Sequence, residues 1–477
     1  MIALLLILIP LVGGLAAFLL RSAQTVRLWS LFISLCSLGL TIWYLVNGNK
    51  QLSVYETEWL SMIGSSFALQ MDGAAALLCL LSAFVYPLLL LSTWKNDFRS
   101  AHSFFGLLML TQAGIHGVFL ASDGLLFYFF WELALIPVYF LCSLWGGEKR
   151  IQVTFKFFVY TFFGSLLMLA GLLYLANQAG GSFALRDLSA VKLSNAQQSW
   201  LFWLLFVAFA IKMPVFPLHT WQPDTYEQAP TAVTMVLSAL MVKMGLFAVI
   251  RWLFPLLPGG VLQYSSLVIW LSIGGLLYAS FIAMRQDDLK RLIAYSSIAH
   301  IGLMNAALFA VRETAFQGVM IQLFSHGVNV LGMWIVADFI EQKTGTRKIS
   351  ELGGLAQNNP LLAILLVVIA LANIALPLTN AFVGEFLMFN GLFEANIWYA
   401  VAAGMGIIFG AIYTLKMIQH VFFGELAEKT IAMGKMGAGA LWSLLLITVL
   451  ILLGGLYPGL FFEITQDSVA GLIALFN

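Results

Sequence analysis

The sequence predicts an all-α integral membrane protein with about fourteen transmembrane helices, arranged as two inverted five-helix repeats in which helices 7 and 12 are discontinuous. Three observations lead to this fold class. Of the 477 residues, 61% are hydrophobic and only 9% are charged, whereas a soluble domain is about 25% charged. Apolar windows long enough to span a bilayer recur along the whole chain. Two of these windows contain a proline that interrupts a helix.

Fourteen apolar windows define the expected helices in chain order. The first lacks a basic leading region and is longer than the core of a signal peptide, so we expect a retained helix there. Residues 47–70 are polar and contain Gly and Ser, and we expect them to form an extramembrane hairpin. The windows are 2–20, 27–46, 72–93, 102–121, 124–146, 153–177, 198–218, 228–254, 262–284, 289–310, 314–340, 360–391, 396–423 and 439–462.

Proline marks the interruption of helices 7 and 12. Pro214 follows Lys212-Met213 in helix 7, and Pro377 precedes Glu385 in helix 12. Paired proline-broken helices point to an inverted-repeat transporter with its ion site near mid-membrane. Each repeat holds five helices, an odd number, so the second copy is expected to lie upside down. The expected parts are 1–101 with helices 1–3, 102–254 with helices 4–8, 262–423 with helices 9–13, and 424–477 with helix 14.

The distribution of Lys and Arg predicts the orientation in the membrane. Loops that follow odd-numbered helices hold fourteen of these residues. The opposite side holds five, namely Lys50, Arg186, Lys192, Arg251 and Arg312. Because basic loops stay in the cytoplasm, both termini are expected on the outer side.

Composition excludes several classes of function. The formal net charge of +1 argues against nucleic acid as a partner. Cys36, Cys79 and Cys142 lie far apart in apolar runs, so they form no CxxC pair and are not expected to hold a metal or an iron–sulfur cluster. No Gly-rich phosphate loop follows a strand, and therefore no nucleotide site is expected.

Ionisable residues inside the apolar windows carry the functional prediction. One such group at the centre of a membrane helix costs about 2.5–3.5 kcal/mol on insertion scales. Several of them, spread over different helices, indicate a path for charge. They are Glu132, Glu385, Lys156, Lys212, Lys243, His116, His300 and His326.

Glu132 in helix 5 and Lys212 in helix 7 form the first expected pair. An ammonium near a desolvated carboxyl favours the charged form of both groups, so closing and opening the pair would change their protonation. The alternative is a static ion pair that fixes helix packing. A well-packed apolar replacement usually serves stability as well as a buried ion pair does, which favours the switch.

Lys243, in the middle of helix 8, has no carboxylate in its own span. A lysine without a fixed partner in a low dielectric is suited to gaining and losing a proton. The alternative is a side chain that reaches to the membrane interface. The position of Lys243 about halfway along the window favours the proton relay.

Two histidines and a glutamate continue the expected path. His300 and His326 lie on consecutive helices, and imidazole both donates and accepts protons near neutral pH. Glu385 follows the break of helix 12 and is expected to release protons outward. A hydrogen-bonded core histidine or a satisfied structural carboxylate is the alternative at each position. His116 is the weakest candidate, and Lys156 and His219 are accessory candidates.

Five sequence strings carry a family resemblance over nearly the whole chain. They are FFWELALIPVYFLCSLWGG, TFKFFVYT, AFAIKMPVFPLHTWQPDTYEQAPT, DDLKRLIAYSSIAHIGL and NAFVGEF. These strings resemble the antiporter-like membrane subunits of respiratory complex I, the NADH–quinone oxidoreductase. Glutamate at position 385 is typical of the chain M branch, because the sister chains L and N carry lysine there. The sequence departs from the resemblance at His116, where an aliphatic residue is expected.

The resemblance implies a proton-translocating subunit of a bacterial inner-membrane NADH–quinone oxidoreductase, without redox chemistry of its own. It implies an axis of Glu132, Lys212, Lys243 and Glu385, with His300 and His326 as connecting residues. Flavin, iron–sulfur clusters and quinone are expected in partner subunits, and chains L and N as membrane neighbours, with no direct NADH contact. The alternatives are a subunit of a cation/proton antiporter or membrane-bound hydrogenase complex, and a purely structural scaffold.

Overall fold

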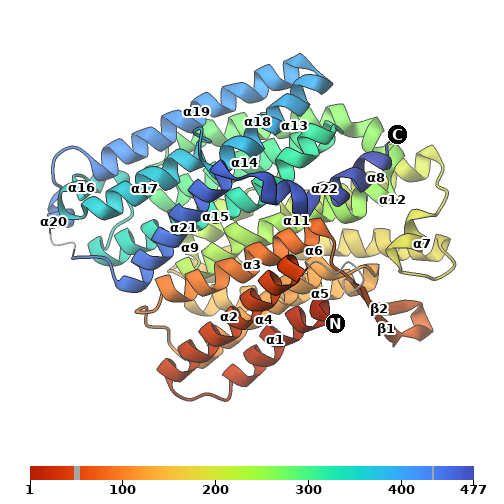
Figure 1. Cartoon of the computed structure of the whole chain (residues 1–477), viewed down its shortest axis with the longest axis horizontal. Helices are drawn as coiled ribbons and strands as arrows, with labels where there is room; N and C mark the ends of the chain where they lie inside the picture. Colours follow the sequence, from red (N-terminus) through yellow and green to blue (C-terminus); the bar gives the residue numbers. More distant parts are fainter. Residues whose placement is uncertain (48–53, 432–433, 477) are drawn as a thin grey trace.

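Long apolar helices form this protein because a segment inside a bilayer has to satisfy every backbone N–H and C=O group internally. The structure, a computed structural model, describes residues 1–47, 54–431 and 434–476. Eleven helices in this part of the chain are long and apolar enough to cross a membrane, and two shorter apolar helices accompany them. The helices run side by side between two ends of the bundle (Figure 1). The predicted all-α membrane fold is confirmed.

The N-terminal part contains three helices and a β-hairpin. The strands pair antiparallel, with Val54 opposite Gln70. The hairpin expected in 47–70 is therefore present, although residues 48–53, with Lys50 among them, lie outside the described residues. The elements are α1 (Ile2–Ala17), α2 (Ala23–Asn47), β1 (Val54–Leu60), η2 (Ser61–Ile63), β2 (Ser65–Gln70) and α3 (Gly73–Ser92).

The next part contains helices 4–8. Helix 7 is discontinuous, as predicted, because α8 ends at Lys212 and α9 begins only at Trp221. In helix 8, two π-helical turns flank the segment that holds Lys243. The elements are α4 (Ala101–Leu120), α5 (Gly124–Trp145), α6 (Arg150–Gln178), α7 (Leu185–Ser189), α8 (Asn195–Lys212), α9 (Trp221–Gln228), α10 (Thr231–Val236), η3 (Leu237–Met241), α11 (Val242–Ala248), η4 (Val249–Leu253) and α12 (Phe254–Leu256).

Helices 9–13 follow, and helix 12 is discontinuous around Pro377, as predicted. Ala375 and Leu378 in this break have φ of 53° and 75°, a left-handed conformation that costs about 1–3 kcal/mol for residues other than glycine. The elements are α13 (Pro258–Ala283), α14 (Leu289–Phe309), α15 (Glu313–Thr344), η5 (Ile349–Glu351), α16 (Leu355–Asn358), α17 (Pro360–Asn373), α18 (Asn380–Ala395) and α19 (Ile397–Phe422).

The C-terminal part corrects the expected end of helix 14. The window 439–462 was expected to hold one helix, but α21 (Ala438–Leu456) stops before Pro458, and α22 (Gly459–Ala474) continues beyond the window. Proline lacks the N–H group that a continuous helix needs. A methyl group on Gly455 would overlap the carbonyl of Leu378, so the end of α21 lies against the break of helix 12. A short helix α20 (Glu428–Ile431) precedes α21.

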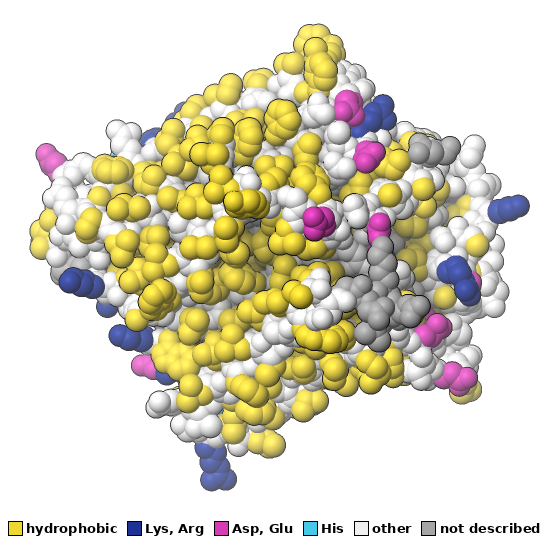
Figure 2. Space-filling view, viewed as in Figure 1, with side chains coloured by type: hydrophobic (Ala, Val, Ile, Leu, Met, Phe, Trp, Pro, Cys, Tyr) yellow, Lys and Arg dark blue, Asp and Glu magenta, His cyan; other side chains and the backbone are white. Residues whose placement is uncertain are grey.

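The bundle has two polar ends, which we name by their contents. The basic face holds the α3–α4, α5–α6, α13–α14 and α15–α17 loops, and the hairpin face holds β1 and β2 at the right of Figure 1. Figure 2 shows hydrophobic side chains across the middle of the molecule and most charged ones toward its two ends. The side of the membrane that each face occupies, and the division at 102–254 and 262–423, stay predictions.

Candidate functional site

Lys243 lies at the centre of the bundle with its side chain fully buried. Its Nζ donates a hydrogen bond of 2.7 Å to the Ser238 carbonyl and lies 2.8 Å from Nδ1 of His326. The expectation that Lys243 lacks a fixed partner is therefore wrong. The π-helical turn Leu237–Met241 holds the Ser238 carbonyl within reach of Nζ, and turns of this kind are frequent at functional sites.

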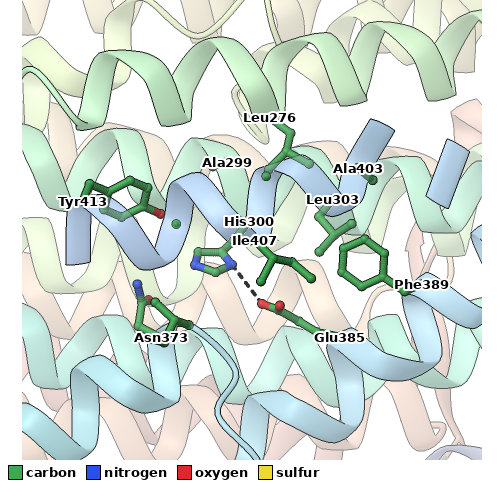
Figure 3. A pocket seen from close by; sticks show the side chains of 13 residues that line it. Leu276, Ala299, His300, Leu303, Asn373, Glu385, Phe389, Ala403, Ile407 and Tyr413 are labelled. Atoms are coloured by element: carbon green, nitrogen blue, oxygen red, sulfur yellow. Dashed lines mark ion pairs between the residues drawn. The ribbon is translucent and has the colours of Figure 1, made fainter. Parts of the chain in front are cut away.

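The two histidines continue from Lys243 to Glu385. The rings of His326 on α15 and His300 on α14 have centroids 5.3 Å apart. Nδ1 of His300 lies 3.3 Å from Oε1 of Glu385 on α18, the contact drawn as a dashed line in Figure 3. Gln322 also donates to this carboxylate oxygen, at 3.3 Å. We call Lys243, His326, His300 and Glu385 the central string, because each member contacts or faces the next.

A small cavity, lined mostly by apolar residues, borders the central string. His300, Glu385, Asn373 and Tyr413 line a space of about 20 Å³, which is enough for one water molecule. Figure 3 shows these side chains around the cavity. Ser296 accepts hydrogen bonds from Asn373 at 3.2 Å and from Tyr413 at 3.0 Å.

Sequence reasoning missed Ser296, Asn373, Tyr413 and Gln322. A single uncharged polar residue in an apolar helix is a weak signal by itself. The position of Asn373 at the end of α17, directly before the break of helix 12, is the one indication that could have identified it.

Lys212 and Glu132 lie apart from the central string. No ion pair joins them among the described residues, so the expected closed pair is not formed in this structure. Nζ of Lys212 lies 5.4 Å from the ring centroid of Trp131, and a cation over an indole face is stabilised by the ring quadrupole. Oε1 of Glu132 and Nζ of Lys212 are both buried without a hydrogen-bond partner within the described chain.

The broken helix 7 touches helix 8 beside Lys243. A Cβ at Gly245 would overlap the backbone nitrogen of Met213 and the carbonyl of Phe209, so only glycine permits this approach. Met213 directly follows Lys212 in the chain. The backbone next to Lys212 therefore packs directly against the segment that carries Lys243.

Lys156, one of the accessory candidates, belongs to a set of ion pairs on the basic face. Its Nζ contacts Asp224 at 2.8 Å and the Thr220 carbonyl at 3.0 Å, both on the second half of helix 7. Arg291 on α14 contacts Asp224 and Glu227. We name the whole set the basic-face network, and its members are Lys156, Asp224, Glu227, Asp288, Lys290, Arg291, Glu341 and Arg347.

The remaining candidates have local surroundings. His219 lies in the break that begins at Pro214, with its ring centroid 5.2 Å from that of Tyr278. His116 is buried, and its Nδ1 lies 2.7 Å from the Leu6 carbonyl, which matches a hydrogen-bonded core histidine.

The central string consists of side-chain types that can take up and release a proton. Imidazole takes a proton at one nitrogen and gives one from the other. Nε2 of His300 and Nε2 of His326 are buried without a partner in the described chain, so each ring has one nitrogen engaged and one open. In residues 1–47, 54–431 and 434–476, no three His, Cys, Asp or Glu side chains gather as a metal ion requires.

Comparison with known proteins gives consistent matches. A family profile described as NADH:quinone oxidoreductase/Mrp antiporter, TM, matches residues 121–410. NADH-quinone oxidoreductase subunit M of Rhodobacter capsulatus is 37% identical over 435 residues, covering 88% of this chain and 84% of that protein. F(420)H(2) dehydrogenase subunit M of Methanosarcina mazei is 34% identical, covering 99% and 98%. A chain of respiratory complex I from Thermus thermophilus with bound NADH matches with a TM-score of 0.92 and 32% identity, covering 100% of both chains.

Proposed function

This chain belongs to the NADH:quinone oxidoreductase/Mrp antiporter family of membrane subunits, and on that premise we propose that it translocates protons in the membrane arm of a complex I-type enzyme. The energy comes from quinone reduction in partner subunits, which hold the flavin, iron–sulfur clusters and quinone. The observation that carries the proposal is the order of neighbours from Lys243 to Glu385. Lys243 contacts His326, the rings of His326 and His300 lie with their centroids 5.3 Å apart, and His300 contacts Glu385.

The transfer begins at Lys243. In its protonated form the side chain donates to Ser238 and faces His326, so a proton can pass to Nδ1 of the imidazole. His326 then passes a proton across the 5.3 Å ring separation to His300, through its other nitrogen. Glu385 receives the proton from His300 and acts as the release group.

Lys212 is the proposed control element. An ammonium that moves along the bundle toward helix 8 disfavours a proton on Lys243, whereas movement of Lys212 toward Glu132 weakens this repulsion. The separated arrangement, with Lys212 over Trp131, is one of the two states that such a switch needs. The contact between Met213 and Gly245 couples the position of Lys212 to helix 8.

We also propose an orientation in the membrane, a direction of transport and a set of neighbours. Basic loops predict that the basic face is cytoplasmic, with both termini outside, in a bacterial inner membrane. Protons then move outward. The neighbours are the antiporter-like chains L and N, and the surrounding lipid covers the apolar middle of the bundle.

A cation/proton antiporter complex is the second candidate, because the family description names Mrp antiporters as well. The same central string serves either parent complex. Co-purification with flavin and iron–sulfur proteins supports the respiratory enzyme, and their absence from a purified, active complex supports the antiporter.

Substitution of Lys212 tests the function. In membrane vesicles with the assembled complex, Lys212→Ala is expected to retain electron transfer to quinone and to lose proton pumping. Lys416→Ala is the matched control, since Lys416 is exposed on α19 and has no role in the proposal. Pumping by Lys212→Ala at the wild-type level would contradict the proposed role.

A further inference from the structure

A large cavity opens on the basic face, away from the central string. It lies between α2, α3, α15 and the start of α21 and has a volume of about 560 Å³. Cavities of about 300–1,000 Å³ are the usual size for sites that bind small molecules. Its apolar wall includes Leu28 and Leu31 of α2, Leu91 of α3, and Ile335 and Phe339 of α15.

Three lysines on different elements line the same cavity. Lys95 follows α3, Lys343 ends α15, and Lys435 precedes α21, and all three are exposed. No ion pair or hydrogen bond engages their ammonium groups within the described residues, in contrast with the paired lysines of the basic-face network. Three unpaired positive charges therefore surround one apolar hollow.

Among the residues that the structure describes, Asp338 is the single carboxylate that lines this cavity. Its Oδ2 accepts hydrogen bonds from Gln342 at 2.8 Å and from Asn96 at 3.3 Å, and the residue is 8% exposed. These donors hold the carboxylate in place without the lysines. The lining thus keeps an excess of positive charge.

We propose that this cavity binds an anionic phospholipid, with the phosphate at Lys95, Lys343 and Lys435 and the acyl chains against α2, α3 and α15. An apolar wall below a ring of ammonium groups matches an amphiphile with a negative head. Basic pockets between transmembrane helices recognise acidic lipid headgroups in this way. The bound lipid would join the N-terminal helices to α15, which carries His326. The site does not depend on proton translocation.

Photo-crosslinking tests the site in the assembled complex. The probes are phosphatidylglycerol and phosphatidylcholine with the same diazirine-labelled acyl chain, and labelled peptides are mapped by mass spectrometry. Phosphatidylglycerol is expected to label α2, α3 and α15 with about a hundredfold preference over phosphatidylcholine, the size that three lysines supply. Equal labelling by both lipids would overturn the proposal.

Two variants and a control identify the groups responsible. The triple variant Lys95→Gln, Lys343→Gln, Lys435→Gln is expected to lose the preference. The triple variant Arg99→Gln, Lys149→Gln, Arg285→Gln removes the same charge from exposed positions on the same face and is expected to keep it. Leu31→Trp fills the space beside the apolar wall, keeps every lysine, and is expected to lose the label. This variant tests the proposal even if the first triple variant does not fold.

A competition experiment separates a lipid from a free phosphate. Excess glycerol 3-phosphate is expected to leave the phosphatidylglycerol label unchanged, because it has no acyl chains for the apolar wall. Displacement by glycerol 3-phosphate would show a phosphate site and overturn the lipid proposal. Wild-type labelling of both the first triple variant and Leu31→Trp would also overturn it.

Discussion

The central string and the basic-face network both contain lysine and glutamate, but in opposite surroundings. In the network, Arg347 contacts Glu227, Asp288 and Glu341, and Arg291 contacts Asp224 and Glu227, so each cation faces carboxylates. In the string, Lys243 faces a histidine, and one nitrogen of each histidine has no partner in the described chain. The charges of the network are fixed, because each stabilises the other. In the proposed function, the groups of the string change charge.

This contrast teaches how to interpret a charge near the membrane core. A cation with several carboxylate partners stays charged and holds elements together, as Arg347 does between α9, α14 and α15. A cation whose neighbour is itself a proton carrier can pass its proton on. Contacts distinguish these two cases, and residue type does not.

Replacement of a string histidine is expected to have the largest effect. His326→Leu removes the acceptor beside Lys243, and the rate of proton transfer through this subunit should fall by about 10²-fold or more, the effect of losing a positioned proton-transfer group. His116→Leu is the matched control, because His116 is also buried and, within the described residues, contacts only the Leu6 carbonyl through its ring nitrogens. It should cost about 1 kcal/mol of stability and leave pumping unchanged. An equal loss of pumping in both variants would contradict the claim that histidines of the central string differ in function from the core histidine His116.

Replacement of a network arginine should act on stability. Arg347→Gln breaks ion pairs to Glu227 and Asp288, and the free energy of unfolding should fall by about 1–3 kcal/mol. Thermal unfolding of the purified protein measures this change. Arg285→Gln, at an exposed position outside the network, should change stability by less than about 0.5 kcal/mol. If Arg347→Gln impaired proton pumping and left stability unchanged, Arg347 would belong to the proton path, which would contradict its proposed structural role.

A glycine substitution tests the contact between two broken helices. Gly455→Ala should destabilise the protein by about 1–3 kcal/mol, because the added methyl group overlaps the Leu378 carbonyl. Gly404→Ala on α19 meets open space and should be neutral or slightly stabilising. Melting temperatures of the two variants provide the comparison. Equal melting temperatures would mean that the backbone around Leu378 moves aside for the added methyl group without loss of stability.

The smallest effect is expected at the edge of the basic face. Hydrogen bonds from Lys429 and Thr346 lower the pKa of the Glu351 carboxyl to about 2. Because the folded pKa is depressed, the stabilisation is fully present above the ordinary carboxyl range and is lost as pH falls toward 2. Lys429→Gln should therefore melt slightly below the wild type at pH 7, with a difference that shrinks in acid. A difference independent of pH would exclude this pair as its source.

Much of the fold could be predicted from the sequence because membrane helices require long apolar windows. Helix 7 and helix 12 are broken where Pro214 and Pro377 indicated. The break at Pro458 also had its proline signal, but the window 439–462 was interpreted as one helix. The π-helical turns around Lys243 had no such signal, because they depend on how helix 8 packs against its neighbours.

The residues of the site could be predicted from the sequence, but most of the contacts between them could not. Lys243, His326, His300 and Glu385 stood out as costly ionisable groups in apolar helices, and the structure brings all four together. The Ser238 carbonyl could not be foreseen as a partner of Lys243, because every residue carries a carbonyl. The separation of Lys212 from Glu132 depends on how helices 5 and 7 lie relative to each other. The spacing of residues along the sequence does not determine this.

The most direct measurement is the number of protons translocated per electron by the assembled complex with Lys243→Met, in sealed vesicles and at equal amounts of assembled complex. Methionine fills the space of the lysine stem without a charge, so folding and electron transfer by partner subunits should be kept. The ratio should be clearly below that of the wild-type complex, with electron transfer still detectable. A wild-type ratio would contradict the claim that the central string carries protons.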